Sequence, residues 1–152
     1  MNGDDCMAGH EKSLVALEYE LTTLVRMLEA LNRCRNYPLE RAHYLLLLQL
    51  REGPLSVGEL ASKLLLDNST VTRQINVMKK KRLIEKVPHP NDGRSALVAA
   101  TPVGHDLAEV MHRLRLDRLR NTLQDWPEED RRVLATLTGR LTRDLVRSME
   151  VT

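Results

Sequence analysis

Leucines recur along the first part of the chain at the spacing of one helix face. Between residues 11 and 33 they follow one another in alternating steps of three and four residues. The seam consists of Leu14, Leu17, Leu21, Leu24, Leu28 and Leu31. This pattern predicts a helix over 11–33 with a narrow apolar face of the coiled-coil type. Because the seam is too short for an autonomous coiled coil, we expect it to need a partner helix, from the same chain or from a second copy.

Two shorter helices are expected next, separated by a clear stop signal. An apolar run favours a buried helix over 39–51, which Gly53-Pro54 would end. Ser56 and Glu59 then have the spacing of a capping box, in which each side chain bonds the backbone amide of the other. We therefore expect a short helix over 57–64.

The second half of the chain predicts a hairpin followed by two long helices. Two short apolar stretches flank a loop rich in Pro, Asn, Asp and Gly, which is typical of a β-hairpin. Thr101 and Pro102 then provide a helix cap and a proline at the first helical position. The expected elements are strands at 84–87 and 95–100, a loop at 88–94, and helices from Pro102 to about residue 123 and over 127–149.

Between these regions, residues 68–81 predict a helix with two different faces, capped by Asp67 or Asn68. Val71, Ile75 and Met78 form one narrow apolar stripe at helical spacing. The opposite side carries Ser69, Arg73, Asn76 and Lys80, flanked by Thr72 and Val77. This side has no acidic residue and offers groups that hydrogen-bond base edges and phosphates. The alternative is an ordinary solvated surface helix.

The charge of the chain is concentrated in the same region. The whole protein carries a formal net charge of +2. Residues 68–94 contain seven basic and two acidic residues, which gives this segment a net charge of +5. A localised positive charge of this kind is typical of nucleic-acid binding. A solvated lysine surface would have the same composition, so the charge by itself leaves both interpretations open.

The composition favours a helical protein and excludes other classes. Aromatic residues make up only 3% of the chain and Phe is absent, so the core must be aliphatic. No run of about 18 apolar residues predicts a membrane span, and the polar, acidic N-terminus does not resemble a signal peptide. Cys6 and Cys34 do not form a disulfide framework. We therefore expect a cytoplasmic protein with reduced thiols.

Four segments resemble the MarR family of winged-helix transcription regulators. Residues 53–64 and 67–75 are similar to the two helices of the family's helix-turn-helix, and residues 92–95 and 101–104 match the Asp-x-Arg and Thr-x-x-Gly pattern of its wing. The chain departs from the family in having Arg82 where a glycine is usual. It also has Ala100 where a leucine usually precedes the wing threonine.

The resemblance implies a mainly α fold with a small β-hairpin, built as a single domain over 1–152. The winged helix-turn-helix lobe would span 39–100. The helices at 11–35 and 101–149 would form the dimerisation region of a homodimer. The alternative is that these helices form a bundle within one chain.

The implied function is that of a sequence-specific regulator of transcription that binds double-stranded DNA, acting as a ligand-responsive repressor on a pseudo-palindromic operator. Within the recognition helix, bases would be contacted by Ser69, Thr72, Arg73 and Asn76, and Thr70 is a further candidate for DNA binding. Lys79, Lys80 and Lys81 suit phosphates, because they are flexible point charges. The resemblance implies that Arg94 of the wing enters the minor groove, and Asp92 could orient it.

The effector and the mode of regulation are less defined by the residues. The family resemblance implies a phenolic or aromatic acid, and Arg41, His43 and Tyr44 are candidates for its pocket. A redox-responsive regulator using Cys34 is an alternative. A metal-responsive one would use Cys34, His43, His105, Glu109 and His112, but no tight ligand motif supports it, so we assign neither a metal nor a cofactor.

We expect no enzymatic activity. The sequence has no Gly-x-Ser-x-Gly motif, no phosphate-binding glycine-rich loop and no HisGluxxHis motif. The remaining alternative is a winged-helix module that binds another protein instead of DNA. Affinity for DNA that falls steeply with salt would separate these classes.

Overall fold

The computed structural model describes residues 4–33 and 36–150, without the side chains of 4–10, 93–95 and 150. The elements in chain order are α1 (Asp4–Arg33), α2 (Arg41–Gln49), a 3-10 turn η1 (Leu50–Glu52), α3 (Val57–Leu64), α4 (Asn68–Lys80), β1 (Ile84–His89), β2 (Asp92–Ala100), α5 (Pro102–Thr122) and α6 (Glu128–Glu150). The fold is therefore mainly α with one two-stranded antiparallel hairpin, as the sequence predicts.

The first helix and the hairpin differ most from the sequence prediction. The first helix begins at Asp4, seven residues before its predicted start at residue 11. The strands are also longer than expected, since Pro88 pairs with Ala96 and His89 with Asp92. The predicted loop at 88–94 therefore shrinks to a turn, because a proline is tolerated in a strand at the edge of a sheet, where it need not donate a ladder hydrogen bond.

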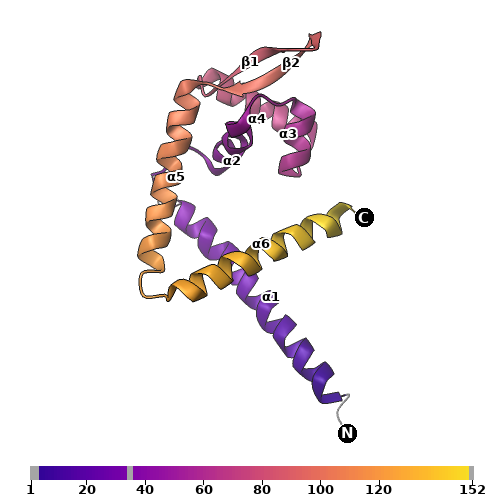
Figure 1. Cartoon of the computed structure of the whole chain (residues 1–152), viewed down its shortest axis with the longest axis vertical. Coiled ribbons are helices and arrows are strands. Elements are labelled where there is room, and N and C mark those ends of the chain that lie inside the picture. Colours follow the sequence, from indigo (N-terminus) through magenta and orange to yellow (C-terminus); the bar gives the residue numbers. More distant parts are fainter. Residues whose placement is uncertain (1–3, 34–35, 151–152) are drawn as a thin grey trace.

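The core lies inside one compact lobe formed by α2, α3, α4, the hairpin and the first half of α5 (Figure 1). Its largest fully buried side chains are Leu46, Leu47, Leu50, Leu60, Val71, Met78, Val98 and Met111. Leu55 also joins the hairpin by pairing with Val98 in an isolated bridge, with N–O distances of 3.0 and 2.7 Å. The α3–α4 pair is thus held firmly against the wing.

The chain turns from the wing into α5 through a tightly packed corner. The Thr101 hydroxyl accepts from the Gly104 amide at 3.1 Å and donates to the Arg82 carbonyl at 2.7 Å. A Cβ on Gly104 would lie only 2.1 Å from the carbonyl oxygen of Leu83. Glycine is therefore required here by the close approach of α5 to the backbone before β1.

The departure at Arg82 has a structural consequence. Its backbone adopts φ +58°, in the left-handed region where a glycine would be less strained. Two backbone hydrogen bonds at the end of α4 stabilise this conformation. The Arg82 amide donates to the Lys79 carbonyl at 3.0 Å, and the Leu83 amide donates to the Met78 carbonyl at 3.0 Å. The residue after α4 thus adopts a left-handed conformation although it is not a glycine.

α1 and α6 extend away from the lobe, and α5 connects the lobe to the corner where α6 begins (Figure 1). Within the described residues, α1, α5 and α6 make no extensive contacts with one another. The structure therefore does not show the alternative of a three-helix bundle within one chain. Their leucines remain exposed instead, as for Leu24 at 52%. None of the helices in the described part of the chain combines the length and apolar character that a membrane span requires.

Candidate nucleic-acid interface

The start of α4 is organised by the carboxylate of Asp67. It accepts hydrogen bonds from the Thr70 amide at 2.8 Å, from the Thr70 hydroxyl at 2.7 Å and from the Ser69 hydroxyl. The bonds from Ser69 and then Thr70 lower the pKa of the Asp67 carboxyl well below its ordinary value. Asp67 therefore remains charged and positions the first turn, while the Thr70 and Ser69 protons are directed to this cap.

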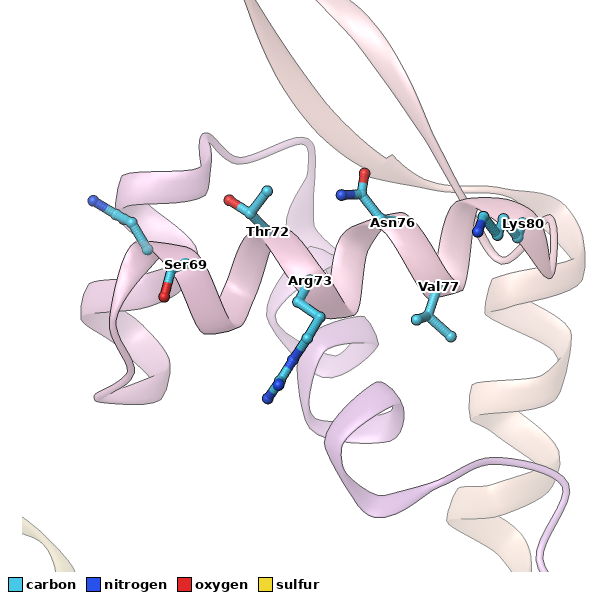
Figure 2. Close-up of a pocket in the computed structure, with 7 residues that line it drawn as sticks. Ser69, Thr72, Arg73, Asn76, Val77 and Lys80 are labelled. Carbon is cyan, nitrogen blue, oxygen red and sulfur yellow. The ribbon is translucent and has the colours of Figure 1, made fainter.

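The polar face of α4 is open to solvent along its whole length. It forms a shallow hollow lined by Asn68, Ser69, Thr72, Arg73, Asn76, Val77 and Lys80 (Figure 2). Figure 2 shows Thr72 and Asn76 pointing to one side of the helix axis, and Arg73 and Val77 pointing to the other. The opposite stripe of Val71, Ile75 and Met78 is buried in the core. The helix therefore divides its two faces as its sequence predicts.

The three lysines at the end of α4 do not share one environment. Lys79 and Lys80 are exposed. The Lys81 Nζ instead lies 3.0 Å from Glu40 Oε1, at the start of α2. The hydrogen bond from Lys81, followed by the charge of His43, lowers the pKa of Glu40. Lys81 is thus engaged within the lobe, a pairing over 41 residues that no local pattern could have indicated.

The wing extends from the lobe as the β1–β2 hairpin (Figure 1). Its turn is closed by the Asn91 amide, which donates to His89 Nδ1 at 3.1 Å. Asp92 is exposed at the start of β2. Arg94 belongs to the same strand, but its side chain lies outside the described residues. The structure therefore brings the predicted wing residues onto one strand, next to the turn.

The three candidates for an effector pocket occupy different environments. Arg41 is exposed, whereas His43 and Tyr44 are buried in the lobe. Burial lowers the pKa of His43, against the opposing influence of Glu40. The Tyr44 hydroxyl lies 3.5 Å from His112 Nδ1, and the Arg115 guanidinium lies 5.4 Å from the Tyr44 ring centre. His43 and Tyr44 thus connect α2 to its neighbours and do not face a common hollow with Arg41.

A different hollow does lie beside Arg41. It is lined by Asn32, Asn36, Tyr37, Pro38, Leu39, Glu40, Arg41, Lys81 and Met111. The buried Tyr37 hydroxyl and Asn32 Oδ1 have no hydrogen-bond partner among the described residues. Of the three predicted pocket residues, Arg41 lines this hollow. Sequence reasoning missed its other residues, because they come from α1, the loop before α2, the end of α4 and α5.

The candidate metal ligands do not form a cluster in the described part of the chain. Glu109 accepts from the Arg51 guanidinium at 3.1 Å, and His112 faces Tyr44. Cys34, on which both the redox and the metal alternatives depend, lies outside the described residues.

Comparisons with known proteins agree with this geometry. Residues 37–95 match the model of the MarR family. The chain is 37% identical over 133 residues to the uncharacterized HTH-type transcriptional regulator YxaD of Bacillus subtilis, covering 86% of this chain and 93% of the relative. It superposes on a MarR family protein from Bacillus stearothermophilus with a TM-score of 0.75 and 26% identity, over 89% of this chain and 96% of that one.

The likeness extends to wild-type MarR of E. coli in its apo form at the level of the fold. The TM-score is 0.60 and the identity 24%, over 68% of this chain and 78% of that one. The helix-turn-helix with its exposed polar face, the wing and these comparisons lead to one assignment: the chain belongs to the MarR family of winged-helix, DNA-binding transcription regulators.

Proposed function

We propose that the protein is a homodimeric repressor that binds a pseudo-palindromic operator through α4 and the β1–β2 wing. The observation that carries this proposal is the exposed face of α4, which presents amide, hydroxyl and guanidinium groups and contains no acidic residue. A duplex offers matching groups, since Arg can form two hydrogen bonds with guanine, and Asn two with adenine, in the major groove. Because DNA is its partner, we propose that the protein acts in the cytoplasm.

The residues divide by the part of the duplex that they would contact. Thr72, Arg73 and Asn76 would contact bases, together with the oxygen of Ser69, while Thr70 supports the helix start through Asp67. Lys79 and Lys80 would contact phosphates. Lys81 would do so only by exchanging its Glu40 partner for a phosphate. In the wing, Arg94 would enter the minor groove, where a narrow groove concentrates negative potential, and Asp92 would orient it.

The exposed leucines of the helical ends support the homodimer. Residues 11–35 and 101–149 would form its interface, and residues 39–100 the DNA-binding lobe of the same single domain. Large apolar side chains are exposed on α1, α5 and α6, among them Leu14, Leu17, Leu24, Leu114, Leu119, Leu134, Leu137 and Leu145. Exposed large apolar side chains in this number support an interface with another chain. A two-fold dimer would present two α4 helices to half-sites about 34 Å apart.

The hollow beside Arg41 supports a ligand response. Arg41 supplies positive charge and the unpartnered Tyr37 hydroxyl supplies a polar contact, whereas the charge of Lys81 in the same hollow is paired with Glu40 and would have to exchange that partner for the ligand. This combination suits an aromatic or phenolic acid. Such a ligand would contact Lys81 at the end of α4, and it would release DNA only if it bound the released state better than the DNA-bound state.

The proposal is tested by gel-shift assays on DNA upstream of the protein's own gene, across a salt series. Specific binding should require dimer-length sites, and log K should fall linearly with log salt. Arg73→Ala should cost about 1–3 kcal/mol of binding and relax base preference at one position. An equal loss on all sequences would instead make Arg73 a phosphate contact, and no salt-dependent binding at all would favour the protein-binding module.

The ligand response has its own test. Aromatic carboxylic acids should weaken the complex with DNA, and Arg41→Ala should remove that effect while DNA binding without ligand is retained. If Arg41→Ala responds to the acids as the natural protein does, the hollow beside Arg41 is not their site.

A further inference from the structure

Val77 is an apolar side chain on the polar face of α4, and neither the core nor the hydrogen-bonding pattern of that face accounts for it. Its side chain is 39% exposed, whereas the core positions of the same helix, Val71, Ile75 and Met78, are at most 2% exposed. Val77 lines the same hollow as Arg73, Asn76 and Lys80, and Figure 2 shows it on the side of the helix where Arg73 lies. It is therefore placed among the groups proposed to meet the duplex.

The chemistry of the side chain restricts what it can contact there. The edges of base pairs in the major groove are hydrogen-bond donors and acceptors, apart from the C5-methyl group of thymine. A valine placed against a donor or acceptor would remove water from that group and leave it unpaired, which is costly. Against a thymine methyl it would bury apolar surface on both sides. Because a β-branched side chain in a helix is nearly restricted to one rotamer, its methyls are held in place before binding.

We propose that Val77 is a specificity-determining residue that packs against the C5-methyl of a thymine in each half-site, beside the bases contacted by Arg73 and Asn76. This inference rests on the proposed function, since it requires α4 to enter the major groove. It adds a base preference that the hydrogen-bonding residues of the helix do not provide. Cytosine at that position would lack the methyl and would present its amino group to an apolar partner.

The experiment begins with selection of preferred sites from a pool of random duplexes by the full-length dimer. Each thymine of the selected site is then replaced singly by deoxyuridine, which removes the methyl and leaves base pairing unchanged. At one position per half-site we expect affinity to fall about fourfold, the value for one buried methyl-sized group. In Val77→Ser, whose side chain has no methyl group, thymine and deoxyuridine should bind equally well at that position.

Two further variants make the result specific. Val103→Ser makes the same chemical change at an exposed valine on α5 and should retain the fourfold difference. Thr72→Ser removes the methyl group of Thr72, which also lies on the polar face of α4. The difference in affinity between thymine and deoxyuridine at this position should be retained in this variant as well. If no thymine is sensitive to deoxyuridine, or if the sensitivity survives in Val77→Ser or is lost in Thr72→Ser, the inference is overturned although DNA binding stands. If no duplex is enriched, the proposed function fails and this inference fails with it.

Discussion

Leucine side chains are buried in one region of this molecule and exposed in another. Leu46 in α2 is fully buried, with 0% of its surface exposed, while Leu24 in α1 is 52% exposed. Of these helices, α1 is predicted from a periodic leucine seam and α2 from an apolar run, and both lie in a chain with an aliphatic composition. The difference lies in what packs against them: α2 is enclosed by α3, α4 and α5, whereas α1 has no extensive packing against any described element.

This contrast divides the molecule into a lobe with its own buried core and helical ends whose leucines are exposed in one protomer, where we propose the dimer interface. In the lobe, about 25 cal/mol is gained per Å² of apolar surface that folding removes from water. At the ends, the same gain becomes available only when two protomers associate. Stability of the lobe and association of the ends should therefore respond to different substitutions.

The largest effect is expected from charges placed in the seam of α1. Leu17→Glu combined with Leu24→Glu should raise the dissociation constant of the dimer by about 10,000-fold or more, because four unpaired carboxylates would be buried in the interface. Sedimentation equilibrium measures this change. Thr22→Glu, on the opposite side of α1, is the matched control and should remain dimeric. A double variant that stays dimeric would show that the seam is not the interface.

The next effect is expected within the lobe. Leu60 of α3 is fully buried, so that Leu60→Ala should reduce the free energy of unfolding by about 2–5 kcal/mol through lost burial and a residual cavity. Urea denaturation measures this quantity. Leu66→Ala changes a leucine at the exposed surface of the lobe and should cost much less. Similar losses at both positions would contradict the idea of a self-contained core.

The corner that connects the two regions provides a third test. Gly104→Ala would place a Cβ 2.1 Å from the Leu83 carbonyl oxygen, a backbone atom that cannot move freely. We expect a loss of about 1–3 kcal/mol of unfolding free energy, as for other overpacked sites. Gly58→Ala in α3, where a Cβ meets no atom within 4 Å, should leave stability unchanged or raise it slightly. Equal thermal unfolding of the two variants would argue against the close approach.

The smallest effect is expected at Arg82. Arg82→Gly should increase the free energy of unfolding by about 1 kcal/mol, since glycine adopts the observed φ of +58° without the steric cost of a Cβ. Arg82→Ala keeps the Cβ and should not give this increase. If the alanine variant were stabilised as much as the glycine variant, removal of the arginine charge would be the cause, and the backbone conformation would not.

Local features of the fold were predictable from the sequence. The capping box of Ser56 and Glu59 is present, with bonds of 2.8 and 3.2 Å. Thr101 caps α5 as expected. Val71, Ile75 and Met78 form the buried stripe that their spacing predicts. These features depend on residues three or four positions apart, so the information needed to predict them is local.

Other features of the candidate interface could not be predicted from residues close together in the sequence. The Lys81–Glu40 pair and the hollow beside Arg41 bring together distant segments. The hydroxyl of Thr70 serves the cap at Asp67, although its position also allowed a contact with DNA. The burial of His43 and Tyr44 depends on how α5 packs on α2. The base-contacting and phosphate-contacting roles stay predictions.

By itself, the sequence determined the order of the helices and the hairpin, their caps and the two-faced character of α4, because these follow from side-chain periodicity and from hydrogen bonds between near neighbours. The tertiary structure alone decided which leucines are buried and which cations are paired. A periodic apolar stripe indicates only that one face of a helix is suited to burial against a partner. What covers it depends on segments far away in the chain, and for α1 no described segment of the same chain covers it.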